Sequence, residues 1–172
     1  LADHDRPYIY LSTLEIVAGF YMVNAVEKPY YWFSYGFNKA GNVIYHELYP
    51  NALEEVSIGR KGYIYTVVAD EQDILPFKNI PCARLGTAPM EVLNCTEIED
   101  CYTWLMEQEK AGKFILHKFE SKTAEQLAWW YNNIFEYIKE KDMIHTPDCS
   151  YAQFVKLKFP QVWERYEREQ GA

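Results

Sequence analysis

Tyrosine alternates with aliphatic residues in separate segments of this chain, and this alternation constrains the fold more than any other feature. Residues 8–11 read Tyr-Ile-Tyr-Leu, and residues 63–67 read Tyr-Ile-Tyr-Thr-Val. Side chains two positions apart on a strand share a face, so Tyr8 and Tyr10 are expected to point the same way, as are the two later tyrosines. If these strands are neighbours, one sheet face carries a row of phenol rings. Such a face can stack a flat ligand, or it can be a core wall whose hydroxyls reach water.

The first half of the chain predicts strands joined by short helices. The expected elements are a strand over 7–11, a helix over 13–24, a hairpin of strands 30–37 and 43–49, a short helix from 51 that ends at Gly59 or Gly62, and a strand over 62–69. Ser12 and Glu15 have the spacing of a capping box before the first helix. Residues 70–90 are rich in proline and predict an irregular loop with short extended pieces at most.

The second half predicts mainly helices. They are expected from 96 to about 110, over 121–141, and from 150 with an interruption at Pro160, with short strands at 90–94 and 114–119. Within 121–141 the 3.6-residue period puts Leu127, Tyr131, Ile134 and Ile138 on one face. Runs of strands followed by runs of helices predict the α+β class, with a mainly antiparallel, tyrosine-rich sheet in the first half and helices in the second. A length of 172 residues predicts a single domain.

Composition limits the partners. The net charge of −8 and the pI near 5.0 argue against nucleic acid, but they leave room for a small phosphorylated ligand held by local cations. No apolar run approaches the length of a membrane span. The four cysteines and four histidines are scattered, which predicts no metal site and buried, reduced thiols in a cytoplasmic protein. The chain begins at Leu1 without a methionine or a signal peptide, so we expect a further segment upstream.

Two acids stand out as catalytic candidates. Glu47 is two positions after Tyr45 and is therefore expected on the same strand face. A carboxylate on a tyrosine face can have a raised pKa, or it can simply accept a hydrogen bond from a tyrosine hydroxyl. Glu91 lies just past the proline-rich loop. Glu97 and Glu99 are expected in the first turn of a helix, where acids favour the dipole.

Anion-binding groups occur in three places. Ser12 and Thr13 lie at a strand-to-helix junction, where backbone N–H groups hold an anion or only cap the helix. Cations group at Arg60-Lys61 and at Lys78 with Arg84, and they either meet a phosphate or carboxylate or belong to the surface.

His117 shares a face with Ile115 and Phe119 by alternation, so it is expected in the core.

The strand at 7–11, the Ser12-Thr13 junction and the aromatic hairpin resemble ADP-ribosyltransferase-like domains, and more closely an uncharacterised bacterial family of that layout. The resemblance covers about residues 7–100. It implies NAD as cofactor, with the nicotinamide on Tyr10 and its ribose held by Ser12, and with Tyr8 and Thr13 in the same site. It also implies that an acid such as Glu91 supports the oxocarbenium-like charge as the glycosidic bond breaks.

This chain departs from the family pattern at two points, and a second function stays open. Leu14 stands where the family has the last serine of its Ser-Thr-Ser motif, and the family's first strand has no counterpart after Leu1. The alternative is a non-catalytic binding or interaction module. Protein partners would then dock on exposed aromatics such as Trp129 or Trp130, one of which must lie off the buried helix face. An enzyme requires a concave pocket with convergent polar side chains, and a module requires a flat apolar patch.

Overall fold

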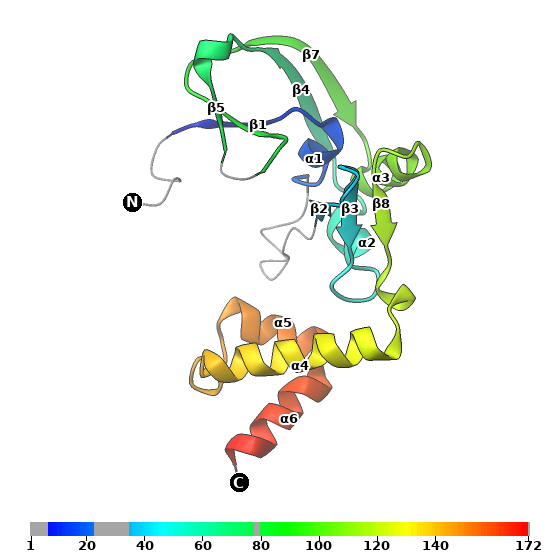
Figure 1. The fold of residues 1–172 in the computed structure, drawn as a ribbon, viewed down its shortest axis with the longest axis vertical. Helices are drawn as coiled ribbons and strands as arrows, with labels where there is room; N and C mark the ends of the chain where they lie inside the picture. The colour runs from blue at the N-terminus through cyan, green and yellow to red at the C-terminus, as the bar shows by residue number, and fades with distance from the viewer. Residues whose placement is uncertain (1–6, 23–34, 78–79, 172) are drawn as a thin grey trace. The chain divides into compact units, whose positions relative to one another are not determined.

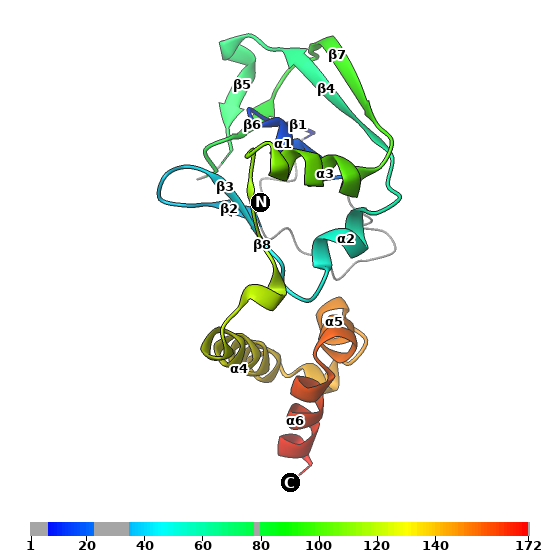
Figure 2. The same cartoon turned by 90° about the vertical axis from the view of Figure 1, so that its right-hand side faces the viewer.

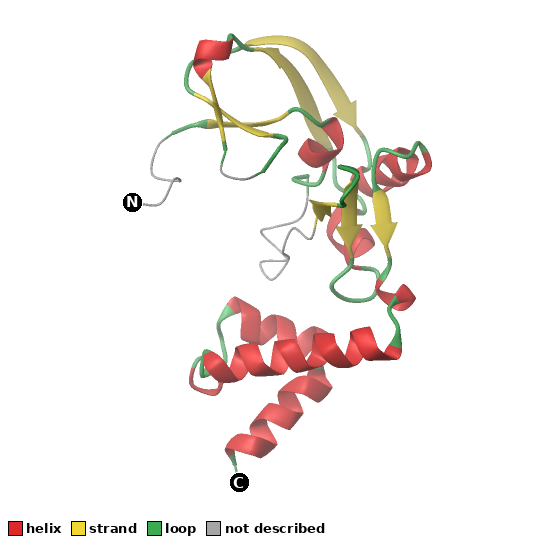
Figure 3. Cartoon of the chain, in the orientation of Figure 1, coloured by secondary structure: helices red, strands yellow, loops and turns green. Residues whose placement is uncertain are grey.

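The computed structural model describes residues 7–22, 35–77 and 80–171 (Figure 1). The chain divides into two compact units, which we call unit 1 (residues 1–23 and 57–115) and unit 2 (residues 24–56 and 116–172). Antiparallel strand pairs dominate the first half and helices the second, as Figure 3 shows, so the predicted α+β class is confirmed.

Unit 1 contains two small antiparallel sheets rather than one. The first has the order β1-β6-β5 and the second pairs β4 with β7. The strands are β1 (Ile9–Ser12), β4 (Gly62–Val68), β5 (Ile74–Pro76), β6 (Ala83–Gly86) and β7 (Glu91–Ile98). The two tyrosine strands, β1 and β4, therefore belong to different sheets, so the condition for a row of phenol rings across neighbouring strands is not met.

The described residues of the segment 70–90 hold two short strands, β5 and β6, which agrees with the predicted loop containing short extended pieces, and these strands pair within a sheet. A single 3₁₀ turn at Glu71–Asp73 leads into β5, and β6 pairs with β5 on one side and with β1 on the other (Figure 2). The one proline within these two strands lies where a sheet tolerates it. Pro76 ends β5, an edge strand of its sheet, where a missing N–H costs least.

The long β4–β7 ribbon has two chemically different faces. Ile64 lies opposite Thr96 and Thr66 opposite Asn94, while Tyr63 and Tyr65 alternate to the other face. The ladder shifts register between Thr66 and Val67, which marks a bulge. The consequence is one polar and aliphatic face and one aromatic face on the same ribbon.

The helix predicted from residue 96 begins later, as α3 (Cys101–Lys110). Residues 96–98 instead continue β7, because each has a cross-strand partner on β4. The N-cap is Asp100, whose Oδ1 accepts the N–H of Thr103 at 2.7 Å. Its Oδ2 accepts the N–H of Gly59 at 2.5 Å, which ties the start of α3 to the turn before β4.

The first helix, α1 (Glu15–Gly19), is shorter than the predicted span of 13–24, of which residues 23 and 24 lie outside the described part. The expected capping box does not form: the Ser12 hydroxyl accepts the N–H of Leu14 at 3.0 Å, and Leu14 itself is the N-cap. Gly19 lies against the ring of Trp104 on α3, where a Cβ atom would overlap ring carbons. The close approach of the two helices therefore depends on a residue without a side chain.

Unit 2 begins with the predicted hairpin. Strand β2 (Tyr35–Phe37) pairs with β3 (Val43–His46), and β3 borders β8 (Ile115–His117), of which Leu116 and His117 belong to unit 2. The Oδ1 of Asn38 accepts the N–H groups of Ala40 and Asn42, and Gly41 has φ +82°. The hairpin and its glycine turn are confirmed over 35–46, while residues 30–34 lie outside the described part.

The helices of unit 2 enclose one hydrophobic core. They are α2 (Ala52–Ser57), α4 (Ala124–Glu140), α5 (Ser150–Lys158) and α6 (Pro160–Gln170), the last three coloured yellow to red in Figure 1. On α4, Ile134 and Ile138 are buried and Leu127 packs partly buried against them, so the predicted face is confirmed. The break at Pro160 is also confirmed, because this proline opens α6 as its first residue.

Candidate ligand site

A cavity of about 540 Å³ lies in unit 1 between β1, the start of α1 and the β4–β7 ribbon. Ligand sites for small molecules typically measure roughly 300–1,000 Å³. The residues that border it are Tyr10, Leu11, Ser12, Thr13, Glu15, Ala18, Ile64, Tyr65, Thr66, Val67, Ala69, Ile74, Arg84, Asn94 and Thr96. Tyr10, Ser12 and Thr13, predicted to bind a cofactor, therefore lie at one cavity. Tyr8 precedes β1, is half-buried and lies outside this lining.

Register identifies which side chains face one another across the cavity. Leu11 lies opposite Arg84 in the β1–β6 pair, so both side chains share one sheet face. The cavity residues Thr66, Asn94 and Thr96 share one face of the β4–β7 ribbon. A cation from one sheet and a row of hydroxyl and amide groups from the other thus border a common space.

Arg84 is oriented by its own strand. Its Nη1 donates to the carbonyl oxygens of Pro81 and Ala83 at 2.7 and 2.8 Å. A guanidinium carries five N–H donors, and these bonds use Nη1 only. Within the described part of the chain, Nε and Nη2 keep their donors for an acceptor. The predicted partner cation, Lys78, lies outside the described residues.

The polar row on the ribbon is connected. The Nδ2 of Asn94 donates to the Oγ1 of Thr96 at 3.3 Å, and Thr66 lies directly across the ladder from Asn94. Sequence reasoning missed all three residues. The alternation that marks this strand continues past residue 94 and could have indicated them. The sequence from Thr96 to Glu99 resembles a capping box, so the strand was expected to end too early.

The aromatic residues at the cavity point largely toward other rings. Tyr10 meets Phe77 edge-on with ring centroids 5.7 Å apart, and the rings of Tyr63 and Tyr65 are 6.3 Å apart. Tyr10 and Tyr65 remain 51% and 58% exposed, so their rings are accessible from solvent.

The backbone at the Ser12-Thr13 junction is already engaged. The Ser12 hydroxyl exchanges hydrogen bonds with both backbone groups of Leu14, and the N–H of Thr13 donates to the carbonyl of Cys82 at 2.8 Å. The junction thus bonds to its own backbone through a local Ser12–Leu14 turn, which is neither the expected helix cap nor an open anion site.

Glu47 belongs to unit 2 and is not among the residues that border this cavity. It is 4% exposed; its Oε1 accepts the N–H of Leu53 at 3.1 Å and its Oε2 the N–H of Phe119 at 3.2 Å. Lys122 donates to the Glu47 carbonyl at 2.8 Å. The carboxylate therefore holds the first turn of α2 to the segment after β8, using both of its oxygens.

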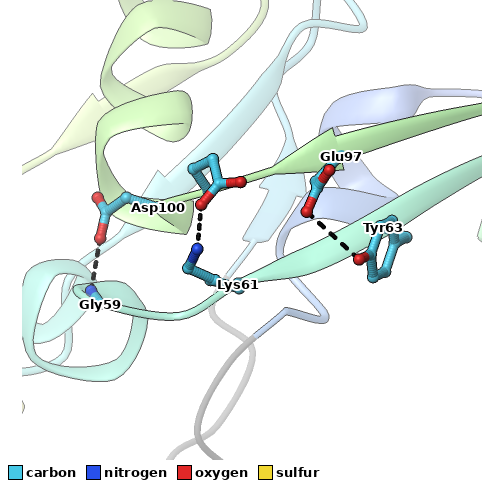
Figure 4. A network of polar contacts seen from close by, with 6 residues as sticks. Gly59, Lys61, Tyr63, Glu97 and Asp100 are labelled. Carbon is cyan, nitrogen blue, oxygen red and sulfur yellow. Dashed lines mark hydrogen bonds and ion pairs between the residues drawn. The ribbon is translucent and has the colours of Figure 1, made fainter.

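The other predicted acids lie on the β4–β7 ribbon or at its end, outside the lining as described. Glu91 is exposed and pairs across the ladder with Val68. Glu97 accepts the hydroxyl of Tyr63 at 3.3 Å, and its negative charge raises the pKa of that phenol. Figure 4 shows this pair beside the ion pair of Lys61 with Glu99. The acid that does border the cavity is Glu15.

The histidine, cysteine and acidic side chains of the described residues were also candidates for a metal or thiol site. Among these described residues, no group of three or more His, Cys, Asp or Glu side chains is arranged to hold a metal ion. All four cysteines are free; Cys82 and Cys101 are buried as expected, whereas Cys95 is exposed and Cys149 half-buried. Burial raises the pKa of the Cys101 thiol to about 11. None of the described helices has the length and apolar character to span a bilayer.

We compared the chain with protein-family models, with curated proteins and with solved structures, and none matched. The likeness to ADP-ribosyltransferase-like domains remains an expectation from the sequence. A function must therefore be argued from the geometry of the cavity in unit 1.

Proposed function

We propose that unit 1 binds a small anionic ligand bearing hydroxyl or amide groups in the cavity between β1 and the β4–β7 ribbon. The observation that carries the proposal is the convergence of Arg84 from one sheet with Thr66, Asn94 and Thr96 from another. A guanidinium binds phosphate or carboxylate, often through two parallel bonds. Hydroxyl and amide groups then fix the orientation of the rest of the ligand.

The pre-set position of Arg84 favours such binding. Its Nη1 bonds to Pro81 and Ala83 hold the guanidinium before a ligand arrives, so less side-chain freedom is lost on binding. Aliphatic residues complete the surface: Leu11, Ile64 and Ile74 border the same space. A few polar groups among apolar ones are typical of small-molecule sites.

NAD is the candidate within this class that the sequence resemblance names. Its pyrophosphate suits Arg84, its ribose hydroxyls suit the polar row, and the exposed ring of Tyr10 offers a stacking surface at the rim. In an ADP-ribosyltransferase-like reaction an acid must support the positive charge that develops on the ribose. Glu15 is better placed for this role than Glu47 or Glu91, because it borders the cavity.

Calorimetric titration of the protein with NAD and ADP-ribose tests the proposal. We expect saturable binding that weakens about tenfold or more in Arg84→Gln, because charged hydrogen bonds contribute about 1.5–3 kcal/mol each. Thr96→Val should weaken binding to a smaller extent. The matched control is Cys95→Ala, the neighbour on the opposite face of β7, which should bind as the parent does. Equal losses in the two β7 variants, or no heat at millimolar ligand, would refute the proposal.

A non-catalytic interaction module is the second candidate, and one observation favours it. Tyr63 and Tyr65 carry neighbouring, exposed rings on β4, and Leu93 on β7 is 63% exposed. Exposed apolar groups of this kind often mark protein contacts. If neither nucleotide raises the melting temperature of the protein, this module becomes the better account, since a ligand selective for the folded state must stabilise it.

A further inference from the structure

Two histidines of unit 2 lie side by side on neighbouring strands. His46 projects from the exposed face of β3 and His117 from β8, with ring centroids 4.7 Å apart and planes tilted by 31°. Both side chains are exposed, so the expectation that His117 lies in the core is wrong. Alternation does place His117 on the face of Ile115, but that face is exposed, and the buried Phe119 belongs to a 3₁₀ turn beyond the end of β8.

Two lysines join this histidine pair. A cavity of about 280 Å³ is bordered by His46, His117, Lys118, Ser121, Lys122, Gln126, Trp129 and Trp130. Lys122 is held in place, with Nζ donating to the Glu47 carbonyl at 2.8 Å and lying 4.7 Å from the centre of the Phe119 ring. An ammonium group has three donors, so others remain for a ligand. In a protein with a net charge of −8, the described lining holds cationic and titratable basic groups and no carboxylate.

These basic groups repel one another. The pKa of His46 is lowered, first by burial and then by the charges of His117 and Lys122. Burial also lowers the pKa of Lys122, against the opposing attraction of Glu47 and Glu120. A bound anion would relieve this repulsion and favour the protonated imidazoles.

Helix α4 supplies an aromatic wall to the same cavity. Gln126, Trp129 and Trp130 are spaced i, i+3 and i+4, which places them on one helix face. The indole N–H of Trp130 donates to the Leu48 carbonyl at 3.2 Å and is thereby fixed. Trp129 is 67% exposed, so its ring is available to stack on a ligand.

We propose that this cavity, formed by His46, His117, Lys118, Lys122 and Trp129, is a second binding site that takes a small phosphate monoester carrying an aromatic ring. The phosphate lies among the imidazoles and ammonium groups, and the ring stacks on Trp129. Two imidazoles beside two ammonium groups are poorly suited to a metal cation, which these charges repel. The site lies wholly within unit 2 and is independent of the proposed ligand site in unit 1.

Phenyl phosphate is the probe, with calorimetry at pH 6.0 and pH 8.0 as the measurement. A phosphate monoester has a second pKa of about 6, so it carries less negative charge at pH 6.0 than at pH 8.0. This loss of charge slightly weakens binding at the lower pH. The bound anion favours protonated His46, which outweighs this effect, so we expect affinity about fivefold higher at pH 6.0. Lys118→Gln should weaken binding severalfold, and His46→Asn should weaken it and reduce the pH dependence. Lys113→Gln, an exposed lysine of unit 1, is the matched control and should change nothing.

Three further comparisons separate the parts of the proposal. Inorganic phosphate should bind more weakly than phenyl phosphate, and Trp129→Leu should abolish that difference. Equal affinities of the parent protein for the two ligands would overturn the role of the ring. Unchanged binding in both His46→Asn and Lys118→Gln would overturn the site itself. Arg84→Gln should leave phenyl phosphate binding intact, and a loss there would assign the phosphate to the cavity of unit 1 instead.

Discussion

Both units bury hydrophobic residues, among them Phe20, Leu105 and Phe114 in unit 1, but unit 1 leaves more large apolar side chains exposed than unit 2 does. In unit 2 the buried residues gather into one core, which contains Tyr49, Ala52, Phe119, Ile134, Phe135, Ile138, Met143, Ala152, Phe154, Val155, Phe159, Val162, Trp163 and Tyr166. In unit 1 many large apolar side chains of the strands remain exposed: Ile9, Tyr10, Tyr63, Tyr65, Val68, Leu75, Val92 and Leu93. Burial of apolar surface stabilises at about 25 cal/mol per Å². Unit 2 is therefore the better candidate for a stable scaffold, and unit 1 for a surface that binds.

The largest effect that tests this contrast is expected when a buried side chain in the core of unit 2 is truncated. Phe154 on α5 is 2% exposed and packs against the rings of Tyr49 and Phe159, at centroid distances of 5.8 and 5.5 Å. Phe154→Ala should lower the free energy of unfolding by about 3–5 kcal/mol. Leu157→Ala on the same helix, where the side chain is 59% exposed, should change it by about 0.5 kcal/mol or less. Urea denaturation followed by circular dichroism measures both, and equal losses would contradict the packed core.

A smaller loss is expected when the buried carboxylate of unit 2 is neutralised. Glu47→Gln leaves one of two backbone N–H groups, those of Leu53 and Phe119, without a good acceptor. An unsatisfied buried group costs about 1–3 kcal/mol. The exposed Glu136→Gln on α4 is the control. Should both variants unfold at the same urea concentration as the parent, the proposed anchoring of α2 by Glu47 would be wrong.

The cap of α3 provides a still smaller, pH-dependent effect in unit 1. Asp100→Ala should lower the free energy of unfolding by about 0.5–2 kcal/mol. The hydrogen bonds from Thr103, and then that from Gly59, hold the pKa of Asp100 below its ordinary value of 3.8. The contribution of the ionised Asp100 carboxylate to the free energy of unfolding is therefore complete above the pKa that this group has in the unfolded state. It is lost as the pH falls through the lower pKa of the folded state.

The pH dependence of this cap is separable from its hydrogen bonds. Asp100→Asn keeps a capping oxygen but removes the charge, so it should retain more stability than Asp100→Ala at neutral pH. Thermal melts of the three proteins between pH 2 and pH 7 measure the difference. A parent protein that loses no more stability in acid than Asp100→Asn would show that the ionised carboxylate contributes nothing.

The smallest expected effect is a change in the pKa of one exposed tyrosine, with no change in the stability of the protein. The charge of Glu97 raises the pKa of the Tyr63 phenol on the exposed face of the ribbon. Glu97→Gln should bring this pKa back toward its ordinary value of 10.0, measured by NMR of labelled tyrosine. Glu91→Gln, on the same strand, should leave it unchanged. If both variants shift Tyr63 equally, the pair drawn in Figure 4 does not persist in solution.

The sequence predicted those elements whose pattern is local. The period of α4, the hairpin turn at Gly41 and the break at Pro160 each depend on residues a few positions apart, and the structure confirms all three. Strand pairing is not local. Nothing in the alternation at β1 indicates that its partner is β6, so the division of the tyrosines between two sheets could not be foreseen.

The sites were harder to predict than the fold. Tyr10, Ser12 and Thr13 do border one cavity, but Arg84 joins them through a pairing with Leu11, which lies 73 positions earlier. Asn94 and Thr96 border it from the β4–β7 ribbon, whose strands pair across 28 and 32 positions. Glu47 was recognised as unusual because it shares a strand face with Tyr45. Its partners are backbone N–H groups of Leu53 and Phe119, which carry no sequence signal at all.

The contact of Gly19 with Trp104 also bears on how this chain can change over time. A side chain at position 19 has no room unless the indole at position 104 is replaced by something smaller, whereas Gly36 has open space where its side chain would be. Substitutions at the two contacting positions are therefore coupled, although they are far apart in sequence. In a set of distant relatives, a correlated exchange at these two positions would be a signature of the α1–α3 contact that survives when overall identity has been lost.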